Sequence, residues 1–229
     1  MTGTIGAHIP GHPTGPGDPF RPWERPVTPP AQPGHDPVSP TRVWLDPHAV
    51  WQAKLSEGLL AKRIVMASGI LDDAAAATLS AQLLTLDAEG EGPIRLELQN
   101  LRAELSAVIT LMGILDVLGA PVHGCVSGEL AGPGLGLLAC CVGRTGYPNA
   151  VFAFTEPRVH LTGTATAVSA REQQVQRMLD TVYFKLADLT GRPVEQIRED
   201  SRQGRVLTTA QAIGYGLIQA QETRRPGMV

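Results

Sequence analysis

Between residues 63 and 154 the sequence alternates short apolar runs with segments of helical periodicity. The apolar runs have the length and composition of buried strands, and the helical segments between them start or end at Asp or Gly residues. Strands and helices that alternate across short loops form parallel βαβ units with right-handed crossovers. The predicted strands cover residues 63–67, 94–98, 121–126 and 151–154, and the predicted helices cover residues 75–86, 105–118 and 135–142. The sequence therefore predicts an α/β domain.

A longer helix is predicted in the C-terminal half of the chain. Ser169 and Glu172 have the spacing of a capping box, and Thr190-Gly191 would end the helix that they open. Thr208 and Gln211 form a second potential capping box, in front of a short apolar helix. The apolar residues of the long helix recur at helical spacing: Val175, Met178, Leu179, Val182, Leu186 and Leu189.

The N-terminal segment differs in composition from the rest of the chain. Residues 1–47 contain twelve of the 19 prolines, and such a segment cannot bury enough apolar surface to offset the entropy of ordering it. We predict a disordered Pro/Gly-rich tail over residues 1–50, a folded domain over residues 51–220 and a polar end over residues 221–229.

The histidines and tryptophans in and next to this segment are potential binding residues. His8, His12 and His35 do not have the spacing of a compact metal-ligand set, so we predict neither a metal nor a cofactor. Three tryptophans could dock on a neighbouring protein, but we expect them to anchor to the chain's own domain: Trp23, Trp44 and Trp51.

Charge and hydropathy exclude several classes of partner. The net charge is −3 and no long basic run occurs, so nucleic acid is not an expected partner. No apolar run reaches the roughly 18–20 residues that span a bilayer, and no secretory signal is recognised, so we expect no membrane partner and a cytoplasmic location. The three cysteines lie in apolar stretches and are predicted to be buried thiols: Cys125, Cys140 and Cys141.

A glycine-rich stretch follows the third predicted strand. From Gly128 to Leu138 the chain contains no Ser, Thr, Cys or Lys. No side chain of this predicted turn could therefore attack a carbonyl carbon.

In the order of its elements and in several phrases, the chain resembles the proteolytic subunit of the Clp protease over residues 55–220. The phrases are Arg63-Ile-Val-Met-Ala-Ser-Gly, Tyr147-Pro-Asn, Glu156-Pro, Ala170-Arg-Glu, Leu189-Thr-Gly and Gly214-Tyr-Gly-Leu-Ile. The resemblance implies a crotonase-like spiral of βαβ units with a long protruding handle helix. It also implies a serine peptidase assembled as stacked heptameric rings around a chamber.

The resemblance places the three positions of the family's catalytic triad on residues that cannot perform its chemistry. The nucleophile falls on Gly132, or on Ala131 if the frame slips by one; the base falls on Thr155, and the carboxylate falls near Ala165. Pro133 has no N–H group to serve as an oxyanion donor. The family's loop that lends a second oxyanion amide is similar in position to residues 100–103, which contain no glycine.

A site rebuilt from other residues is the alternative. Ser127 could pair with His123 or His160 in an active serine peptidase or hydrolase of the same family. Glu129 could act as a lone acid, although a solvated turn residue is the simpler interpretation.

The sequence thus favours a noncatalytic subunit of a Clp-type ring that modulates ATP-dependent proteolysis. We expect it to assemble with itself or with an active paralogue, and a Clp ATPase could dock on the ring. A third hypothesis is a free-standing adaptor that uses the Pro-rich tail as a ligand.

Overall fold

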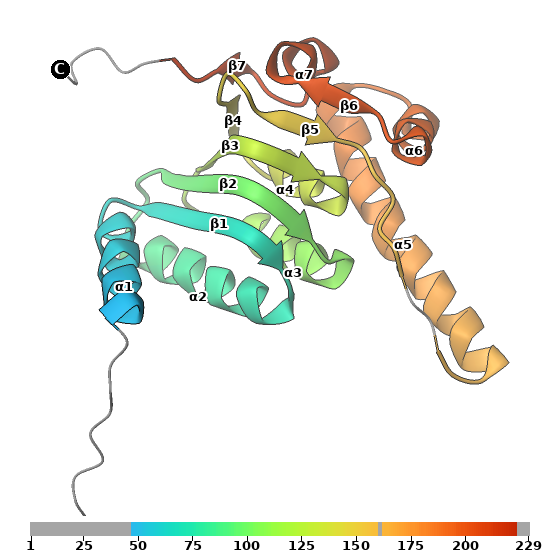
Figure 1. Ribbon diagram of the computed structural model, residues 1–229, viewed down its shortest axis with the longest axis horizontal. Coiled ribbons are helices and arrows are strands. Elements are labelled where there is room, and N and C mark those ends of the chain that lie inside the picture. The colour runs from blue at the N-terminus through green and yellow to red at the C-terminus, as the bar shows by residue number, and fades with distance from the viewer. Residues whose placement is uncertain (1–46, 160–161, 224–229) are drawn as a thin grey trace, which may run out of the picture. The chain divides into compact units, whose positions relative to one another are not determined.

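The computed structural model describes residues 47–159 and 162–223 of the 229-residue chain. Helices and strands alternate as the sequence predicts (Figure 1). The helices are α1 (Pro47–Leu60), α2 (Asp73–Glu89), α3 (Leu105–Leu115), the 3₁₀ turn η1 (Gly132–Gly134), α4 (Leu135–Ala139), α5 (Ala165–Thr190), α6 (Val194–Gln203) and α7 (Thr209–Tyr215). The strands are β1 (Ile64–Leu71), β2 (Ile94–Ala103), β3 (Val122–Ala131), β4 (Gly143–Gly146), β5 (Val151–Ala153), β6 (Val206–Thr208) and β7 (Ala220–Gln221).

These strands form one mostly parallel sheet in the order β1-β2-β3-β4-β7. Strand β3 has two partners on one side: residues 123–126 pair with β4, and residues 129–131 pair with β5. Strand β6 pairs antiparallel with β5. The predicted α/β fold with a long helix is confirmed, and the divided pairing of β3 brings the segment after β5 close to the carboxyl end of β3.

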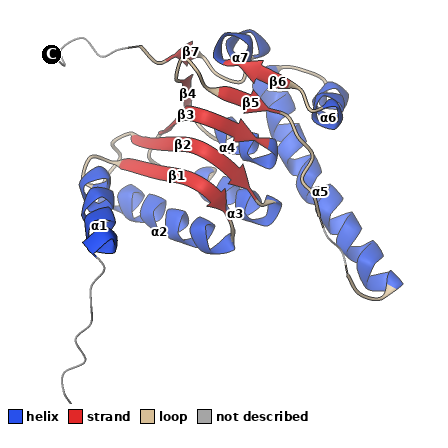
Figure 2. Cartoon of the chain, in the orientation of Figure 1, coloured by secondary structure: helices blue, strands red, loops and turns tan. Residues whose placement is uncertain are grey.

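Alternate residues of the central strands point into the core. Helices α2 and α3 lie along one side of β1 and β2 (Figure 2), and the side chains facing them, such as Val65, Leu98 and Val126, are fully buried. Each such side chain stabilises the fold by about 1.5–3 kcal/mol through removal of apolar surface from water. Residues of opposite orientation, such as Met66 and His123, are exposed.

The third strand is longer than the sequence predicts. We expected a glycine-rich turn from Gly128, but β3 continues to Ala131. A register shift lies at this point, with Gly128 at φ +73° and Asn100 of β2 at φ +45°. The backbone N–H of Glu129 donates to Oδ1 of Asn100 at 3.1 Å. This bulge lets both strands continue. Strand β1 likewise runs past residue 67, the end of the predicted strand, and through a register shift at Gly69 to Leu71.

Residues 100–103 are therefore part of β2. The resemblance aligns the family's oxyanion loop with these positions, and in this chain they are strand instead of loop. Leu101 and Arg102 pair with Leu130 and Ala131 of β3, because the bulge restores the ladder beyond Asn100.

The N-cap of the long helix lies five residues before the predicted one, Ser169. Thr164 is the N-cap of α5, and its Oγ1 accepts a hydrogen bond from the N–H of Ala167 at 3.3 Å. Ser169 lies inside the helix, because the alanines after Thr164 favour helical backbone and Thr164 already satisfies a terminal donor. The predicted end at Gly191, at φ +67°, and the capping box of Thr208 with Gln211 are both confirmed.

The two halves of α5 have different surroundings. Val182 and Leu186 are buried in the core, whereas residues 165–167 and 169–174 are exposed. In Figure 1 the N-terminal half of α5 extends away from the sheet. Val175 and Met178 are half-buried at the junction, so the predicted apolar stripe is core only in its C-terminal part.

Most of the predicted tail, residues 1–50, lies outside the described residues, as do Trp23, Trp44 and the tail histidines; residues 47–50 lie in α1. Trp51 is 61% exposed, so the expectation that it anchors to its own domain is wrong. At the other end, Gln221 lies in β7, and residues 224–229 are not described.

Candidate functional site

Two of the three predicted triad positions lie side by side. Gly132 follows directly on β3, in the left-handed region at φ +57°. A Cβ atom placed on it would lie 3.0 Å from Oγ1 of Thr155 and 3.1 Å from its carbonyl oxygen. The position of the nucleophile and that of the base therefore meet at the carboxyl end of the sheet.

The third position is not part of this arrangement. Ala165 is the first residue of α5, it is exposed, and it is not among the residues that line the cavity beside Gly132. Residues 160 and 161, just before α5, are not described.

A cavity of about 740 Å³ adjoins Gly132 and Thr155. Its wall comes from the ends of β2 and β3, the start of α3, the segment after β5 and the middle of α5. The lining residues are Arg102, Ala103, Glu104, Leu105, Ser106, Glu129, Ala131, Gly132, Pro133, Thr155, Pro157, Arg158, Val159, Arg171, Val175 and Met178. Within the described part of the chain, no His, Cys, Lys or Asp contributes to this wall.

Neither hydroxyl group of the cavity is hydrogen-bonded to a His or Lys side chain of the described residues. The Ser106 hydroxyl donates a 2.9 Å hydrogen bond to Oδ1 of Asp73, at the start of α2. Thr155 Oγ1 forms no hydrogen bond with another described residue. An unactivated hydroxyl is a poor nucleophile at neutral pH.

The backbone around Gly132 also lacks a donor. Pro133 has no N–H group, and it follows the nucleophile position directly. A developing oxyanion next to residue 132 would therefore find no hydrogen bond from residue 133.

The segment after β5 is held in place by a buried polar cluster. The N–H of Phe154 donates to the carbonyl oxygen of Arg205 at 2.8 Å, and the Arg205 guanidinium donates to Oδ1 of Asp200 at 3.0 Å. The Tyr215 hydroxyl donates to Oδ2 of Asp200, and its ring packs on that of Phe154 with centroids 5.2 Å apart. These contacts position Thr155, the next residue.

The residues proposed for a rebuilt site do not form a pair in the described chain. His123 and Ser127 lie on the same strand, four residues apart, which separates them by roughly 13 Å along β3. His160 lies outside the described residues. Glu129 does line the cavity, from β3, and its side chain is exposed.

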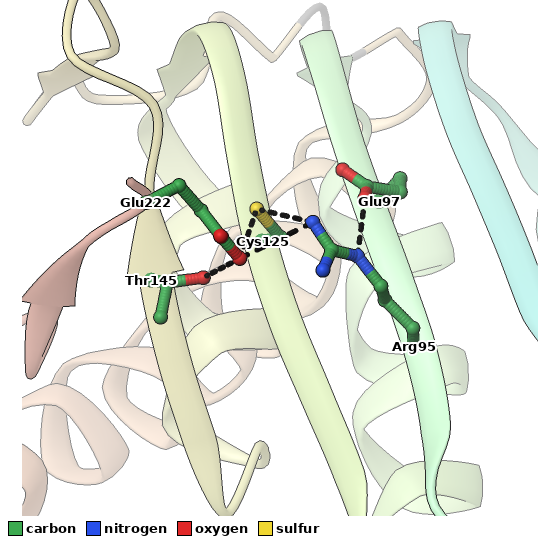
Figure 3. A network of polar contacts seen from close by, with 5 residues as sticks. All are labelled: Arg95, Glu97, Cys125, Thr145 and Glu222. Carbon is green, nitrogen blue, oxygen red and sulfur yellow. Dashed lines mark hydrogen bonds and ion pairs between the residues drawn. The ribbon is translucent and has the colours of Figure 1, made fainter. Parts of the chain in front are cut away.

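A second polar cluster, which sequence reasoning missed, lies on the opposite face of the sheet from α2 and α3 (Figure 3). Arg95 of β2 donates hydrogen bonds to Glu97 on the same strand and to Sγ of Cys125, the latter at 3.3 Å. It also forms an ion pair with Glu222 at 3.2 Å. Thr145 of β4 donates to the same carboxylate at 3.0 Å. The cluster links β2, β3, β4 and the residue after β7. Its only signal in the sequence was that the charged residues Arg95 and Glu97 alternate with apolar residues along the strand.

The thiols are poorly suited to nucleophilic chemistry. Cys125 and Cys141 are buried, Cys140 is half-buried, and all three are free. Burial raises the pKa of Cys125 to about 11 and the pKa of Cys140 and Cys141 to about 12. Because the thiolate is the reactive form, these groups are inert near neutral pH.

The described residues contain neither a membrane-spanning helix nor a cluster of metal ligands. No helix among them is both long enough and apolar enough to cross a bilayer. Nowhere in residues 47–159 and 162–223 do three or more His, Cys, Asp or Glu side chains gather as a metal site would require.

Comparison with known proteins agrees with the fold and with the predicted resemblance. Residues 48–223 match the Clp protease family. The chain is 31% identical, over 163 residues, to the ATP-dependent Clp protease proteolytic subunit 1 of Nocardia farcinica (strain IFM 10152), an alignment that covers 70% of this chain and 83% of that protein. The chain belongs to the Clp protease family.

Proposed function

We propose that this chain is a noncatalytic subunit of a Clp-type proteolytic complex. The observation that carries the proposal is the cavity in which Gly132 and Thr155 meet, since neither residue has the nucleophilic or imidazole side chain of the family's mechanism and no His or Lys is among the described residues of the wall. The resemblance assigns these two positions to the nucleophile and the base, and Ala165 to the carboxylate.

The expected loss of activity is large. Removal of a nucleophile or base from a serine protease triad costs roughly 10⁶-fold in kcat, and the catalysis that remains rests on the oxyanion hole and on binding. Pro133 removes a donor from that hole as well. On this proposal the triad's contribution to peptide-bond cleavage is lost, and that of the oxyanion hole is reduced by one donor.

Assembly is the role that the remaining structure supports. The exposed N-terminal half of α5 resembles the handle by which stacked rings of the family interlock, and an unburied half-helix of this length is suited to a protein interface. We propose that the chain joins a ring with copies of itself or with an active paralogue, and thereby modulates ATP-dependent proteolysis. A Clp ATPase could dock on such a ring.

Two experiments test this function. The purified chain is incubated with a fluorophosphonate probe and with fluorogenic peptides, with an active Clp proteolytic subunit as the positive control. No labelling and no turnover are expected; labelling that Ser127→Ala abolishes would establish a rebuilt serine site instead. Native mass spectrometry of the chain, alone and mixed with an active paralogue, should show ring-sized species. A monomer under both conditions would contradict the assembly role.

A further inference from the structure

Charge is distributed unevenly around the Gly132 cavity. On the side formed by the sheet, Arg102 lies with Glu104 and Glu129, so one cation stands against two carboxylates. Arg102 and Glu129 also line a neighbouring cavity together, which places the two side chains close to each other. The sheet side therefore has no excess of positive charge.

The side formed by α5 carries only cations. Arg158 comes from the segment after β5 and Arg171 comes from the exposed half of α5. Neither forms an ion pair with any other residue that the structure describes, and among those residues the Arg171 guanidinium donates only to the neutral Oε1 of Gln174, at 3.2 Å. Two arginines thus line the cavity without an ion-pair partner among the described residues.

The wall between these arginines and Gly132 offers backbone groups to a ligand. Residues 155–159 are non-helical and mostly exposed, and they form no backbone hydrogen bond within the described chain. Unpaired N–H and C=O groups along such a segment match the backbone of another polypeptide. Val159, Val175 and Met178 add apolar surface to the same wall.

The charge pattern reverses on the other side of this wall. Pro157, Val159 and Val175 also line an adjoining cavity of about 420 Å³, whose carboxylates include Glu156 and Glu172. The arginines of that second cavity are paired, Arg198 with Asp180 at 2.8 Å and Arg202 with Glu199 at 2.9 Å. A ligand carboxylate would be repelled there, so the sign of charge distinguishes the two cavities.

From these observations we propose that the Gly132 cavity binds, without cutting, polypeptide segments that carry a carboxylate side chain, and that Arg158 and Arg171 are the residues that bind this carboxylate. The inference rests on the proposed noncatalytic function and adds to it the class of ligand that the site holds. A guanidinium matches a carboxylate in geometry as well as in charge, which favours Asp or Glu over Asn or Gln in the bound segment.

The test uses two capped peptides of seven residues that differ only at the central position, Glu in one and Gln in the other. Each carries a neutral coumarin label, and binding to the full-length chain is measured by fluorescence anisotropy at low salt. The Glu peptide should bind roughly threefold to tenfold more tightly, as expected for two partly exposed charge pairs. The preference should shrink at 1 M salt, because the pairs are screened.

Variants assign the preference to the two arginines. In Arg158→Gln/Arg171→Gln the two peptides should bind equally, whereas Arg158→Lys/Arg171→Lys should retain part of the preference. Arg177→Gln is the matched control, because Arg177 is exposed on α5 and lines neither cavity. All these side chains are exposed, so thermal unfolding should be unchanged.

The outcomes separate the two proposals. Equal binding of both peptides by the natural chain, or tighter binding of a peptide with a central Lys, would overturn the inference while leaving the noncatalytic function in place. After the binding measurement, mass spectrometry of the recovered peptides detects any cleavage. Cleavage of the Glu peptide would overturn the noncatalytic function even if the preference for the carboxylate held.

Discussion

The hydroxyl of Tyr215 donates a 2.6 Å hydrogen bond to the buried carboxylate of Asp200. Asp200 lies on α6 and is 6% exposed, and its second partner is Arg205, whose carbonyl oxygen accepts from the N–H of Phe154. The contact between Tyr215 and Asp200 therefore joins the C-terminal elements to the segment that carries Thr155.

Replacing Tyr215 with Phe tests this relationship. The ring contact with Phe154 is retained, but Asp200 loses a hydrogen bond to a charged group, which costs about 1.5–3 kcal/mol of the free energy of unfolding. Urea unfolding should show a lower midpoint with an unchanged slope. Tyr147→Phe is the control, since that side chain is 41% exposed; equal midpoints for the two variants would contradict the role given to Tyr215.

Restoring a serine at Gly132 should not restore activity. Gly132→Ser places a side chain at φ +57°, with Cβ 3.0 Å from Oγ1 of Thr155, and the new hydroxyl would still have Thr155 beside it where the family has a His. We expect a loss of about 1–2 kcal/mol in stability from the left-handed backbone and no turnover of a fluorogenic peptide. Gly58→Ser is the stability control, because a Cβ there meets nothing within 4 Å. Peptide cleavage by the Gly132→Ser variant would show that an unrecognised base is present.

The start of α5 can be tested with two alanine substitutions. Thr164→Ala removes the side-chain cap, so it should destabilise the exposed half of the helix by about 1 kcal/mol. Ser169→Ala changes a residue inside the helix and should leave stability unchanged or slightly raised. Hydrogen exchange of the amides of residues 165–174 measures both effects, and the opposite ranking would place the N-terminus at Ser169.

The environment of Cys125 predicts how its reactivity depends on pH. Burial raises the pKa of its thiol to about 11, with Glu97 and Glu222 contributing and Arg95 opposing. Alkylation by iodoacetamide, followed residue by residue with mass spectrometry, should rise about tenfold per pH unit between pH 8 and 10. A rate independent of pH would contradict this environment.

Glu222 should influence that thiol directly. Glu222→Gln removes a negative charge beside Sγ, so Cys125 should react faster at a given pH, whereas Glu195→Gln on α6 should have no effect. In the folded chain the Cys125 thiol stays protonated to a higher pH than in the unfolded chain, where its pKa is 9.0. Its contribution to stability is therefore fully present below about pH 9 and is lost as the pH rises through about 11.

Local patterns in the sequence were enough for the alternation of strands and helices, the box at Thr208 and Gln211 and the end of α5 at Gly191. The absence of a nucleophile between Gly128 and Leu138 is likewise a property of the sequence alone. These features depend on residues a few positions apart, whose conformational preferences act within a single turn or strand.

Only the tertiary structure decided where β3 ends, that Thr155 meets Gly132, and that Arg95, Cys125 and Glu222 form one cluster. Strand length depends on hydrogen bonds to partner strands, and the bulge at Gly128 and Asn100 involves residues 28 positions apart. Contacts between residues distant in sequence follow from which strands pair and in what register, and no local pattern of side chains carries that information.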